Sequence, residues 1–559
     1  MSIGLLLFEK GLIDRAQLDR AVDEERLTGE RLEKVLLRLG AVTRAQVLEA
    51  MAEQFHMTVV DLSTAEVDRE VLSLLPAKIV TRQMCVPISK RNGTLTVATS
   101  DPAGLFELDE LRLLTGFTIE VVLADEEELQ GFIRTHYGVG SDTLEQMAAG
   151  KEFDTSVATD AADADVEQAQ EASVIKLVND LLGEAVVERA TDVHIEPYEH
   201  DLVVRYRIDG VLQRANVPAT INRFGNAIIS RLKIMANMNI AEKRKPQDGR
   251  ITIRHRIEGR VQEFDLRVSI IPMLFGEGVV LRVLSKSAVL LNLEDLGMPA
   301  DMLSRWDAMI NRPHGILLVT GPTGSGKSTT LYSSLNRIVS DEVKVITVED
   351  PVEYHVPGVN QIQVNPKVGL TFAAGLRSVL RHDPDVVMIG EIRDQETAET
   401  AVQASLTGHL VFSTLHTNDA AGATTRLLDM GVEPFLVASS VEGVLAQRLV
   451  RRICRHCAAP QPVDRADVPA DFPFDNATLM RGVGCRECRQ TGYRGRIGVF
   501  ELFAMTDPLR ELVMARKNAH EIAARAIADR DLTLLKHDGY AKVRAGSTTI
   551  SEVLRALTA

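Results

Sequence analysis

The chain has 559 residues, which is too long for a single hydrophobic core, and its 45% hydrophobic and 25% charged side chains are those of an ordinary globular protein. Its formal net charge of −15 argues against a protein that coats nucleic acid, because phosphate binding needs a concentrated basic face. The mean hydropathy is zero, and no stretch approaches the roughly 18 uninterrupted apolar residues of a membrane-spanning helix. The apolar run at residues 3–8 is shorter than that of a secretory signal, so we expect a cytoplasmic protein.

The first sixty residues contain an internal repeat at an offset of 29. Five residues are shared by the two copies, so that Gly11, Arg15, Ala16, Gln17 and Ala21 recur as Gly40, Arg44, Ala45, Gln46 and Ala50. The apolar spacing in both copies is typical of amphipathic helices. We therefore predict a helical repeat domain over residues 1–60.

A small α/β domain is predicted over residues 61–140. Strands at 86–88 and 95–98 flank an Asn92-Gly93 turn, and a helical stretch, a strand at 118–123 and another helix follow. Residues 141–171 then carry nine acidic side chains and one basic one, with almost nothing large and apolar. This composition predicts a solvated acidic linker over 141–172.

Residues 173–290 have the pattern of an α+β domain. A helix at 174–188 precedes strands at 202–208 and 211–213, which join at Asp209-Gly210. Three further strands are predicted at 251–256, 263–268 and 279–284.

Single arginines, Arg250, Arg267 and Arg282, stand in or beside these strands. Most isolated arginines are solvated. An arginine on a rigid strand also suits the delivery of a cation onto the γ-phosphate of a nucleotide in a neighbouring subunit.

After Pro313 the pattern changes to short apolar strands that alternate with helices. These strands are 316–320, 345–348, 386–389 and 410–414. Continuous apolar runs of this kind are typical of a parallel sheet covered on both faces, which predicts an α/β domain over residues 291–559.

A phosphate-binding motif follows the first of these strands and precedes a helix. It consists of Gly321, Pro322, Thr323, Gly324, Ser325, Gly326, Lys327, Ser328 and Thr329. In such a P-loop the glycines let main-chain amides surround the phosphates, the lysine reaches the β and γ oxygens, and the hydroxyl after it holds Mg²⁺. We therefore predict that this segment binds ATP with Mg²⁺. A glycine turn that only reverses the chain would leave Lys327 and its strand context unexplained.

Two strand ends carry carboxylates. The strand 386–389 ends in Gly390-Glu391, where an ordinary Walker B motif has aspartate at the position of Gly390, so Glu391 must act on the attacking water or on Mg²⁺. The strand 345–348 ends in Glu349, with Asp350 and Glu353 close behind, which is either a second catalytic group or a solvated acidic turn.

His416 follows the strand 410–414 by one residue and can reach a γ-phosphate from a strand end, although a capping or core histidine has the same spacing. Its sequence position alone leaves both interpretations open.

Four of the five cysteines form two Cys-x-x-Cys pairs, Cys454 with Cys457 and Cys485 with Cys488, separated by 27 residues. Such spacing predicts a tetrahedral Zn²⁺ site that fastens an insert at 450–495. Zinc ribbons also bind nucleic acid, but basic and aromatic residues are sparse here. Cys85 is interpreted as a small buried hydrophobic residue.

Several segments resemble one family closely. The runs Glu349-Asp-Pro-Val-Glu353, 381–394 and 407–418 are similar to the Asp box, Walker B and His box of the secretion ATPase superfamily. Within it, the runs 192–198, 204–210 and 246–250 and the tetracysteine insert resemble the type II secretion assembly ATPases (GspE), with the type IV pilus extension ATPases (PilB) as close relatives. The resemblance covers residues from about 173 to the end.

This resemblance implies a PAS-like middle domain, a RecA-like ATPase domain and a homo-hexamer at the cytoplasmic face of the inner membrane, recruited there by platform proteins. It implies that Arg250 and Arg267 reach the phosphates and that Glu349 and Glu391 share water activation and metal binding. Three more arginines, Arg377, Arg381 and Arg426, would line the nucleotide from the ATPase side. A retraction motor usually lacks the cysteine insert and the long amino-terminal region. Two readings stay open beside type II secretion: pilus extension, and a nucleotide-gated scaffold with little turnover.

The amino-terminal repeat also resembles the cyclic di-GMP-binding domain of some of these ATPases. Its copies depart from the Arg-Leu-Gly pattern, which is Ser2-Ile3-Gly4 before the first and Arg31-Leu32-Glu33 before the second. Loss of an arginine and gain of a carboxylate both disfavour an anionic ligand, so we expect docking to a membrane-anchored partner in preference to dinucleotide binding.

Overall fold

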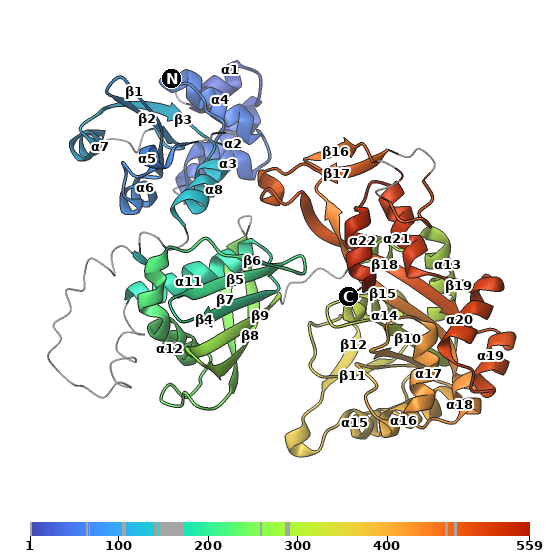
Figure 1. The fold of residues 1–559 in the computed structure, drawn as a ribbon. Coiled ribbons are helices and arrows are strands. Elements are labelled where there is room, and N and C mark those ends of the chain that lie inside the picture. The colour runs from blue at the N-terminus through green and yellow to red at the C-terminus, as the bar shows by residue number, and fades with distance from the viewer. Residues whose placement is uncertain are drawn as a thin grey trace. The chain divides into compact units, whose positions relative to one another are not determined.

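The computed structural model describes residues 3–28, 30–62, 65, 67–102, 108–138, 140, 143–144, 172–257, 260–285, 291–463, 465, 468–474 and 478–558. The chain divides into two compact units, one of residues 1–259 and 265–283 and one of residues 260–264 and 284–559 (Figure 1). The predicted acidic linker lies almost wholly outside the described residues.

The first unit begins with four helices, α1 (Ile3–Glu9), α2 (Arg15–Thr28), α3 (Leu32–Arg38) and α4 (Arg44–Phe55). Their spacing follows the sequence repeat. Gly11 and Gly40 end α1 and α3 with φ of 69° and 67°, a left-handed conformation that favours glycine. Each second helix starts with a reciprocal cap, Asp14 with Gln17 and Thr43 with Gln46. Among the recurring residues, the two glycines therefore end helices and the two glutamines cap them.

A three-stranded sheet follows, in the order β1 (Cys85–Arg91), β2 (Thr94–Thr99) and β3 (Thr118–Leu123). The predicted hairpin forms at Asn92 and Gly93, both with positive φ. Helices accompany the sheet: α5 (Arg69–Leu72), α6 (Ala77–Gln83), α7 (Leu108–Thr115) and α8 (Glu126–Tyr137). Cys85 is buried in this core, as expected of a small hydrophobic residue.

The remainder of the first unit is a six-stranded antiparallel sheet with α11 (Ala172–Val187), a 3-10 turn at Ala219–Phe224 and α12 (Gly225–Met235). Its strands lie in the order β6 (Val211–Arg214), β5 (Leu202–Ile208), β4 (Asp192–Pro197), β9 (Gly276–Ser285), β8 (Arg260–Met273) and β7 (Gln247–Ile257). Alternate side chains such as Val193, Tyr206 and Leu266 are buried. The intervening positions carry the polar residues of the opposite face.

The second unit is built on an eight-stranded sheet. Its order is β12 (Val359–Gln363), β11 (Val345–Glu349), β13 (Val386–Ile389), β14 (Leu410–Leu415), β10 (Gly315–Thr320), β15 (Val441–Ile453), β18 (Tyr493–Ala504) and β19 (Leu532–Thr533). The first six strands are parallel, whereas β18 and β19 run antiparallel to their neighbours. The four predicted strands are present, but the sheet is mixed rather than wholly parallel.

Both faces of this sheet are covered. Ile316 and Leu318 of β10 belong to one buried cluster, whereas Leu317 and Val319 belong to another, so successive side chains enter opposite cores. The helices are α13 (Ala300–Ile310), α14 (Lys327–Ile338), α15 (Phe372–Val379), α16 (Gln395–Leu406), α17 (Ala421–Asp429), α18 (Pro434–Ser440), α19 (Asp507–Met514), α20 (Ala519–Ala528), α21 (Leu535–Arg544) and α22 (Ile550–Thr558). A two-stranded ribbon of β16 (Ala458–Gln461) and β17 (Leu479–Gly482) lies within the predicted insert at 450–495.

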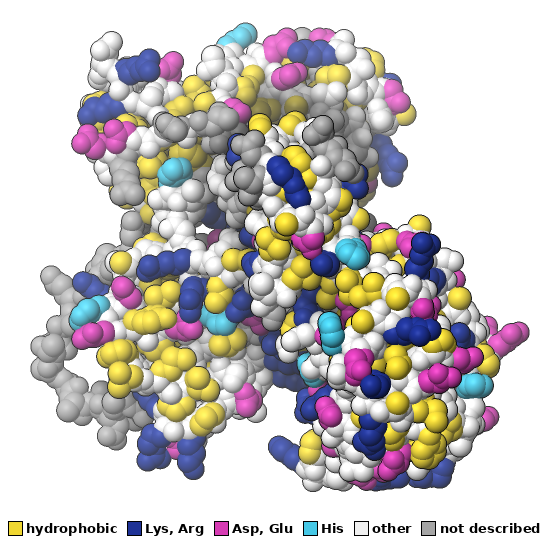
Figure 2. Space-filling view, turned by 45° about the vertical axis from the view of Figure 1, so that its right-hand side comes forward, with side chains coloured by type: hydrophobic (Ala, Val, Ile, Leu, Met, Phe, Trp, Pro, Cys, Tyr) yellow, Lys and Arg dark blue, Asp and Glu magenta, His cyan; other side chains and the backbone are white. Residues whose placement is uncertain are grey.

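Basic, acidic and apolar side chains are interspersed on the face shown in Figure 2. Within the described part of the chain, none of the helices has the length and apolar character needed to cross a bilayer.

Candidate active site

The P-loop joins the end of β10 to the start of α14. Gly321, Gly324 and Gly326 have φ of 146°, 80° and 91°, which glycine adopts without strain. A Cβ atom on Gly321 would lie 2.5 Å from the carbonyl oxygen of Gln447 on β15. Only glycine therefore fits at the entry to the loop, and the tight turn delivers the chain into a helix N-terminus, where main-chain amides bind anions.

Lys327 is the first residue of α14, and its side chain folds back over the loop. Its Nζ atom donates to the carbonyl oxygens of Gly321 at 2.8 Å and Pro322 at 3.0 Å. Burial, opposed by the charge of Glu391 and assisted by that of Arg448, lowers the pKa of Lys327 to about 8. The amine is thus already held where the loop closes around an anion.

This depressed pKa predicts a pH dependence of nucleotide affinity. The ammonium that binds phosphate is present below a pKa of about 8 and is lost above it. Raising the pH from 7 to 9 should therefore weaken MgATP binding by about tenfold, because one unit above a pKa leaves about a tenth of the group protonated. Titration calorimetry across this range measures the effect. In Lys327→Arg, whose guanidinium does not titrate there, the affinity should stay flat; the same decline in both proteins would assign the titration to another group.

The rest of the loop also fits a phosphate. The hydroxyl of Ser325 is buried, and no hydrogen-bond partner for it exists among the described residues. A buried hydroxyl without a hydrogen-bond partner costs about 1–3 kcal/mol of folding free energy. An anion that accepts a hydrogen bond from Ser325 would recover this cost. Ser328 lies exposed in the first turn of α14, as a Mg²⁺ ligand must. Serine and carboxylate oxygens are donors that suit Mg²⁺, so Ser328 and Glu391 are the residues that would hold it.

The polar residues of the site gather at one edge of the sheet. Because β10, β14, β13 and β11 are parallel neighbours, their carboxyl ends coincide, and each end is followed by a predicted site residue. Glu391 comes two residues after β13 and His416 directly after β14, and His416 Nε2 lies 3.3 Å from Glu391 Oε2. The structure thus joins two residues that the sequence predicted separately.

Arg393, which the sequence analysis did not single out, donates from Nη2 to Glu391 Oε1. Burial alone would raise the pKa of Glu391, but Arg393 and His416 outweigh it and lower that pKa. Glu391 is therefore ionised at neutral pH and oriented by two donors. The only sequence signal for Arg393 is its place on the same loop, two residues after Glu391.

Glu349 has a different environment. It is 4% exposed and accepts from the Tyr332 hydroxyl, from Thr347 Oγ1 at 2.5 Å and from Gln361 Nε2 at 3.1 Å. Both carboxylate oxygens are thus occupied by neutral donors from α14, β11 and β12. It is not a solvated acidic turn residue, and its lone pairs are less available to water than those of Glu391.

The sequence comparisons show the family of this chain. The model of the type II/IV secretion system protein family matches residues 167–555, which is more than half of the chain. This chain belongs to the type II/IV secretion system protein family. The prediction of a secretion-family ATPase is confirmed. A second model, the MshEN domain, matches residues 55–143. The resemblance to a cyclic di-GMP-binding domain was predicted for the helical repeat at 1–60, most of which lies outside this match.

Two curated relatives of this secretion-family protein align over nearly their full length. The type IV pilus assembly ATPase PilB of Myxococcus xanthus is 43% identical over 560 residues, covering 99% of this chain and 98% of the relative. The type II secretion system protein E of Xanthomonas campestris is 43% identical over 559 residues, covering 98% and 97%. Among solved structures, the ATPase DotB of Yersinia pseudotuberculosis has a TM-score of 0.53 at 22% identity, covering 70% of this chain and 95% of DotB. The predicted RecA-like fold of the secretion ATPases is confirmed.

Of the three arginines expected to line the nucleotide, Arg377 and Arg426 lie on α15 and α17, and Arg381 lies in the turn after α15. Arg377 on α15 pairs with Glu396 on α16, and Arg381 donates from Nη1 to the carbonyl oxygen of Arg377 at 2.7 Å. Arg426 is exposed on α17. These contacts tie Arg377 and Arg381 to α15 and α16, so the predicted role of all three at the nucleotide stays a prediction.

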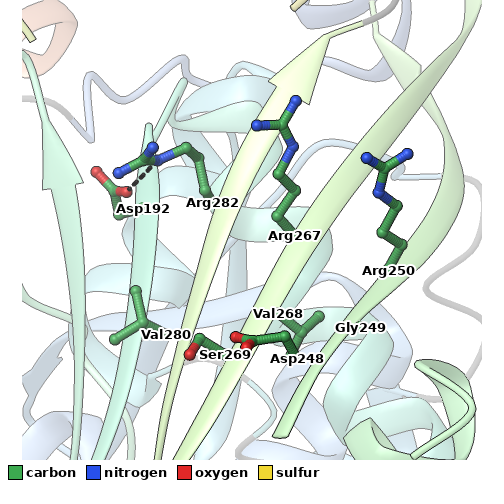
Figure 3. Close-up of a pocket in the computed structure, with 9 residues that line it drawn as sticks. All are labelled: Asp192, Asp248, Gly249, Arg250, Arg267, Val268, Ser269, Val280 and Arg282. Atoms are coloured by element: carbon green, nitrogen blue, oxygen red, sulfur yellow. Dashed lines mark hydrogen bonds and ion pairs between the residues drawn. The ribbon is translucent and has the colours of Figure 1, made fainter. Parts of the chain in front are cut away.

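In the other unit, three arginines of the antiparallel sheet share one cavity of about 450 Å³. Figure 3 shows Arg250, Arg267 and Arg282 on neighbouring strands with their guanidinium groups on the same side. Asp192 pairs with Arg282, its Oδ1 lying 3.4 Å from Nε. A row of guanidinium groups on a rigid sheet is a geometry that binds phosphate, and the delivery of Arg250 and Arg267 to the P-loop stays a prediction.

The four insert cysteines form one cluster. Their sulfur atoms all lie within 4.8 Å of one another, and three of the Sγ–Sγ distances, 454–485, 457–488 and 485–488, are 3.7 Å. Four thiolates at about 2.3 Å from a tetrahedral Zn²⁺ would be separated by about 3.8 Å, which is close to these values. The main-chain amides of Cys485 and Gly492 also donate to Cys488 Sγ, as they do to ligand thiolates. The donor set therefore fits zinc.

Zinc analysis tests this cluster. We expect one Zn²⁺ per chain by plasma emission spectrometry, and none in Cys454→Ser, whose insert should become sensitive to proteolysis because the metal replaces a core there. Cys85→Ala, which alters a cysteine outside the cluster, should keep its zinc. Zinc retained in Cys454→Ser at full occupancy would contradict the assignment.

The helical repeat presents Arg31 to a carboxylate of the same unit. Its Nη2 donates to Asp101 Oδ2 at 2.8 Å, and Glu33 lies 4.0 Å from Nη1. The hydrogen bond to Asp101 and its charge raise the pKa of Arg31. The arginine that would read a dinucleotide is thus paired within the protein, and the expectation against such a ligand stays a prediction.

Proposed function

We propose that this chain is an ATP-hydrolysing motor that powers pseudopilus assembly and protein export in type II secretion. The observation that carries the proposal is the common sheet edge at which the P-loop, Glu391 and His416 meet. A P-loop alone indicates nucleotide binding, whereas an ionised, oriented carboxylate beside it supplies the group that hydrolysis needs.

Each residue of the site has a separate role in phosphate binding, metal binding or water activation. Lys327 and the amides of the P-loop bind the β- and γ-phosphates, and Mg²⁺ bound by Ser328 and Glu391 would neutralise their charge. Glu391 orients the attacking water and accepts its proton, because it is the carboxylate with access to solvent. His416 fixes the orientation of Glu391, and Glu349 supports the strand end through Tyr332.

The motor works as a homo-hexamer. Arg250 and Arg267 belong to the compact unit that does not contain the P-loop, and arginines that complete a phosphate site from another subunit make hydrolysis depend on assembly. We infer recruitment to the cytoplasmic face of the inner membrane by platform proteins that bind residues 1–140. Nucleic acid is not a proposed ligand, because the net charge is −15. Cyclic di-GMP is a less favoured ligand of residues 1–60 than a protein partner, because Arg31 is paired with Asp101.

Pilus extension is the alternative, and the equal identity to both full-length relatives supports it as well. The run Val193-His-Ile-Glu-Pro197 favours secretion. Placing Lys327→Ala in the host cell should retain exported proteins inside the cell while surface pili persist. Loss of pili with secretion intact would establish the alternative, and loss of neither would contradict both.

A nucleotide-gated scaffold with little turnover is a candidate of another class, because Gly390 stands where aspartate is usual. The Glu391 geometry argues against it. If Glu391→Gln left the rate of ATP hydrolysis unchanged from that of the wild-type chain, the scaffold would be favoured.

A further inference from the structure

Arg448 is a buried charge next to the P-loop that the site described so far does not use. The parallel register of β10 with β15 pairs Thr320 with Ala446, so Arg448 lies two residues further along the same face, beyond the end of β10. Its side chain therefore reaches the loop that follows Thr320. Arg448 is 4% exposed.

Its guanidinium contacts both the P-loop and the segment that follows His416. Nη2 donates to the carbonyl oxygen of Asn418 at 3.1 Å, and Nη1 donates to that of Gln447 at 3.3 Å. A Cβ atom on Gly321 would lie 3.2 Å from Nη1, so the first glycine of the P-loop packs directly on the guanidinium. Nε is buried and has no hydrogen-bond partner among the described residues.

The segment that Arg448 holds is the one that carries His416. Thr417 donates its main-chain amide to Thr320 Oγ1 at 2.9 Å, and Asn418 accepts from Arg448. His416 is thus followed by two anchored residues, one fixed to the end of β10 and one fixed to β15. Movement of Gly321 or of Arg448 would shift the histidine that orients Glu391.

The charge of Arg448 is balanced at a distance rather than by a direct ion pair. Glu501 on β18 faces Ala446 in the strand register, which puts it on the same face as Arg448, and it accepts from the amides of Ala420 and Leu535 at 2.7 and 3.2 Å. Glu501 and Asp419 attract the guanidinium. A buried arginine with an unbonded Nε costs folding free energy that an apolar side chain of similar length would not, which indicates a role other than stability.

We propose that Arg448 is a positioning residue that couples the P-loop at Gly321 to the His416 segment at Asn418. Arg448 acts through His416 and Glu391. This inference rests on the proposed hydrolytic function of that site. Its consequence is specific: loss of Arg448 should slow hydrolysis by misplacing His416, while nucleotide still binds to the P-loop.

The test is a double-mutant cycle of Arg448→Met with His416→Ala, read out by steady-state phosphate release. Arg448→Met should lower kcat by at least about tenfold with KM for MgATP changed less than about threefold, because small displacements of positioned groups cost that much. Added to His416→Ala, it should have almost no further effect. Arg448→Lys keeps the charge without the forked donors and should recover part of the rate.

The controls separate a positioning role from a structural one. Arg452→Met changes another arginine of β15 and should leave kcat unchanged. The reactivity of the Lys327 amine towards acylating reagents reports its pKa, because only the deprotonated amine reacts. That pKa should rise in Arg448→Met, since the Arg448 charge lowers it in the wild-type chain. If Arg448→Met fails to fold, Arg448→Lys enters the same cycle.

The proposal would be overturned if the effects of the Arg448 and His416 substitutions on kcat multiplied independently. It would also be overturned if Arg448→Met changed only KM. A wild-type chain that hydrolyses no ATP would instead contradict the proposed function, so the two failures are distinguishable.

Discussion

Replacement of Lys327 by alanine is expected to lower kcat/KM for ATP hydrolysis by about 10²–10³, since loss of one preorganised group at a developing charge costs that much. The amine lies against the carbonyl oxygens of Gly321 and Pro322, where no neighbouring cation can take its place without moving the loop. Arg448, a neighbouring cation, is held in place by the carbonyl oxygens of Asn418 and Gln447. Phosphate release by the purified chain with Mg²⁺ measures the effect.

Lys344→Ala is the matched control. Lys344 is exposed at the amino end of β11, the edge of the sheet opposite the P-loop, and its amine donates to the carbonyl oxygen of His382. The control should retain full activity. Hydrolysis by Lys327→Ala at the wild-type rate would show that phosphate is bound elsewhere.

Glu391→Gln should lower kcat by about 10²–10³ while MgATP still binds, because general-base catalysis and charge stabilisation each contribute on that order. Glutamine keeps the shape and accepts from Arg393 or from His416 through its single amide oxygen, but it cannot take a proton. Phosphate release gives kcat, and calorimetry with the variant gives the affinity.

Glu349→Gln should cost less in kcat and more in stability. Its carboxylate is enclosed by Tyr332, Thr347 and Gln361, and a buried network that loses one acceptor pays in folding free energy. Thermal unfolding of the two variants separates these effects. The reverse ranking, with Glu349→Gln inactive and Glu391→Gln active, would exchange the two roles.

The sequence predicted elements whose pattern is local. Asn92-Gly93 and Asp209-Gly210 turn with positive φ as hairpin residues do, and the apolar runs beside the P-loop form the parallel centre of the sheet. The strands β15 and β18 were not predicted, because they alternate apolar residues with charged ones such as Arg448 and Glu501. Such side chains look solvated in sequence, and only the tertiary pairing of the two strands buries them.

The same limit applies within the site. The P-loop, Glu391 and His416 follow from spacing after strands. The contacts of Arg393 with Glu391 and of Tyr332 with Glu349 depend on loop conformation and on the approach of α14 to β11, neither of which has a periodic signal. The sequence therefore predicted the P-loop, Glu391 and His416, whereas it did not predict the contacts that Arg393 and Tyr332 make with the two carboxylates.

The central claim is that the amides and the lysine of the P-loop hold a nucleoside triphosphate beside Glu391. Isothermal titration of the wild-type chain with a non-hydrolysable ATP analogue and Mg²⁺ tests it most directly. The structure predicts saturable binding of one nucleotide per chain at pH 7, which Lys327→Ala abolishes and Lys344→Ala preserves. No heat of association with the wild-type chain, or equal binding by Lys327→Ala, would contradict the account.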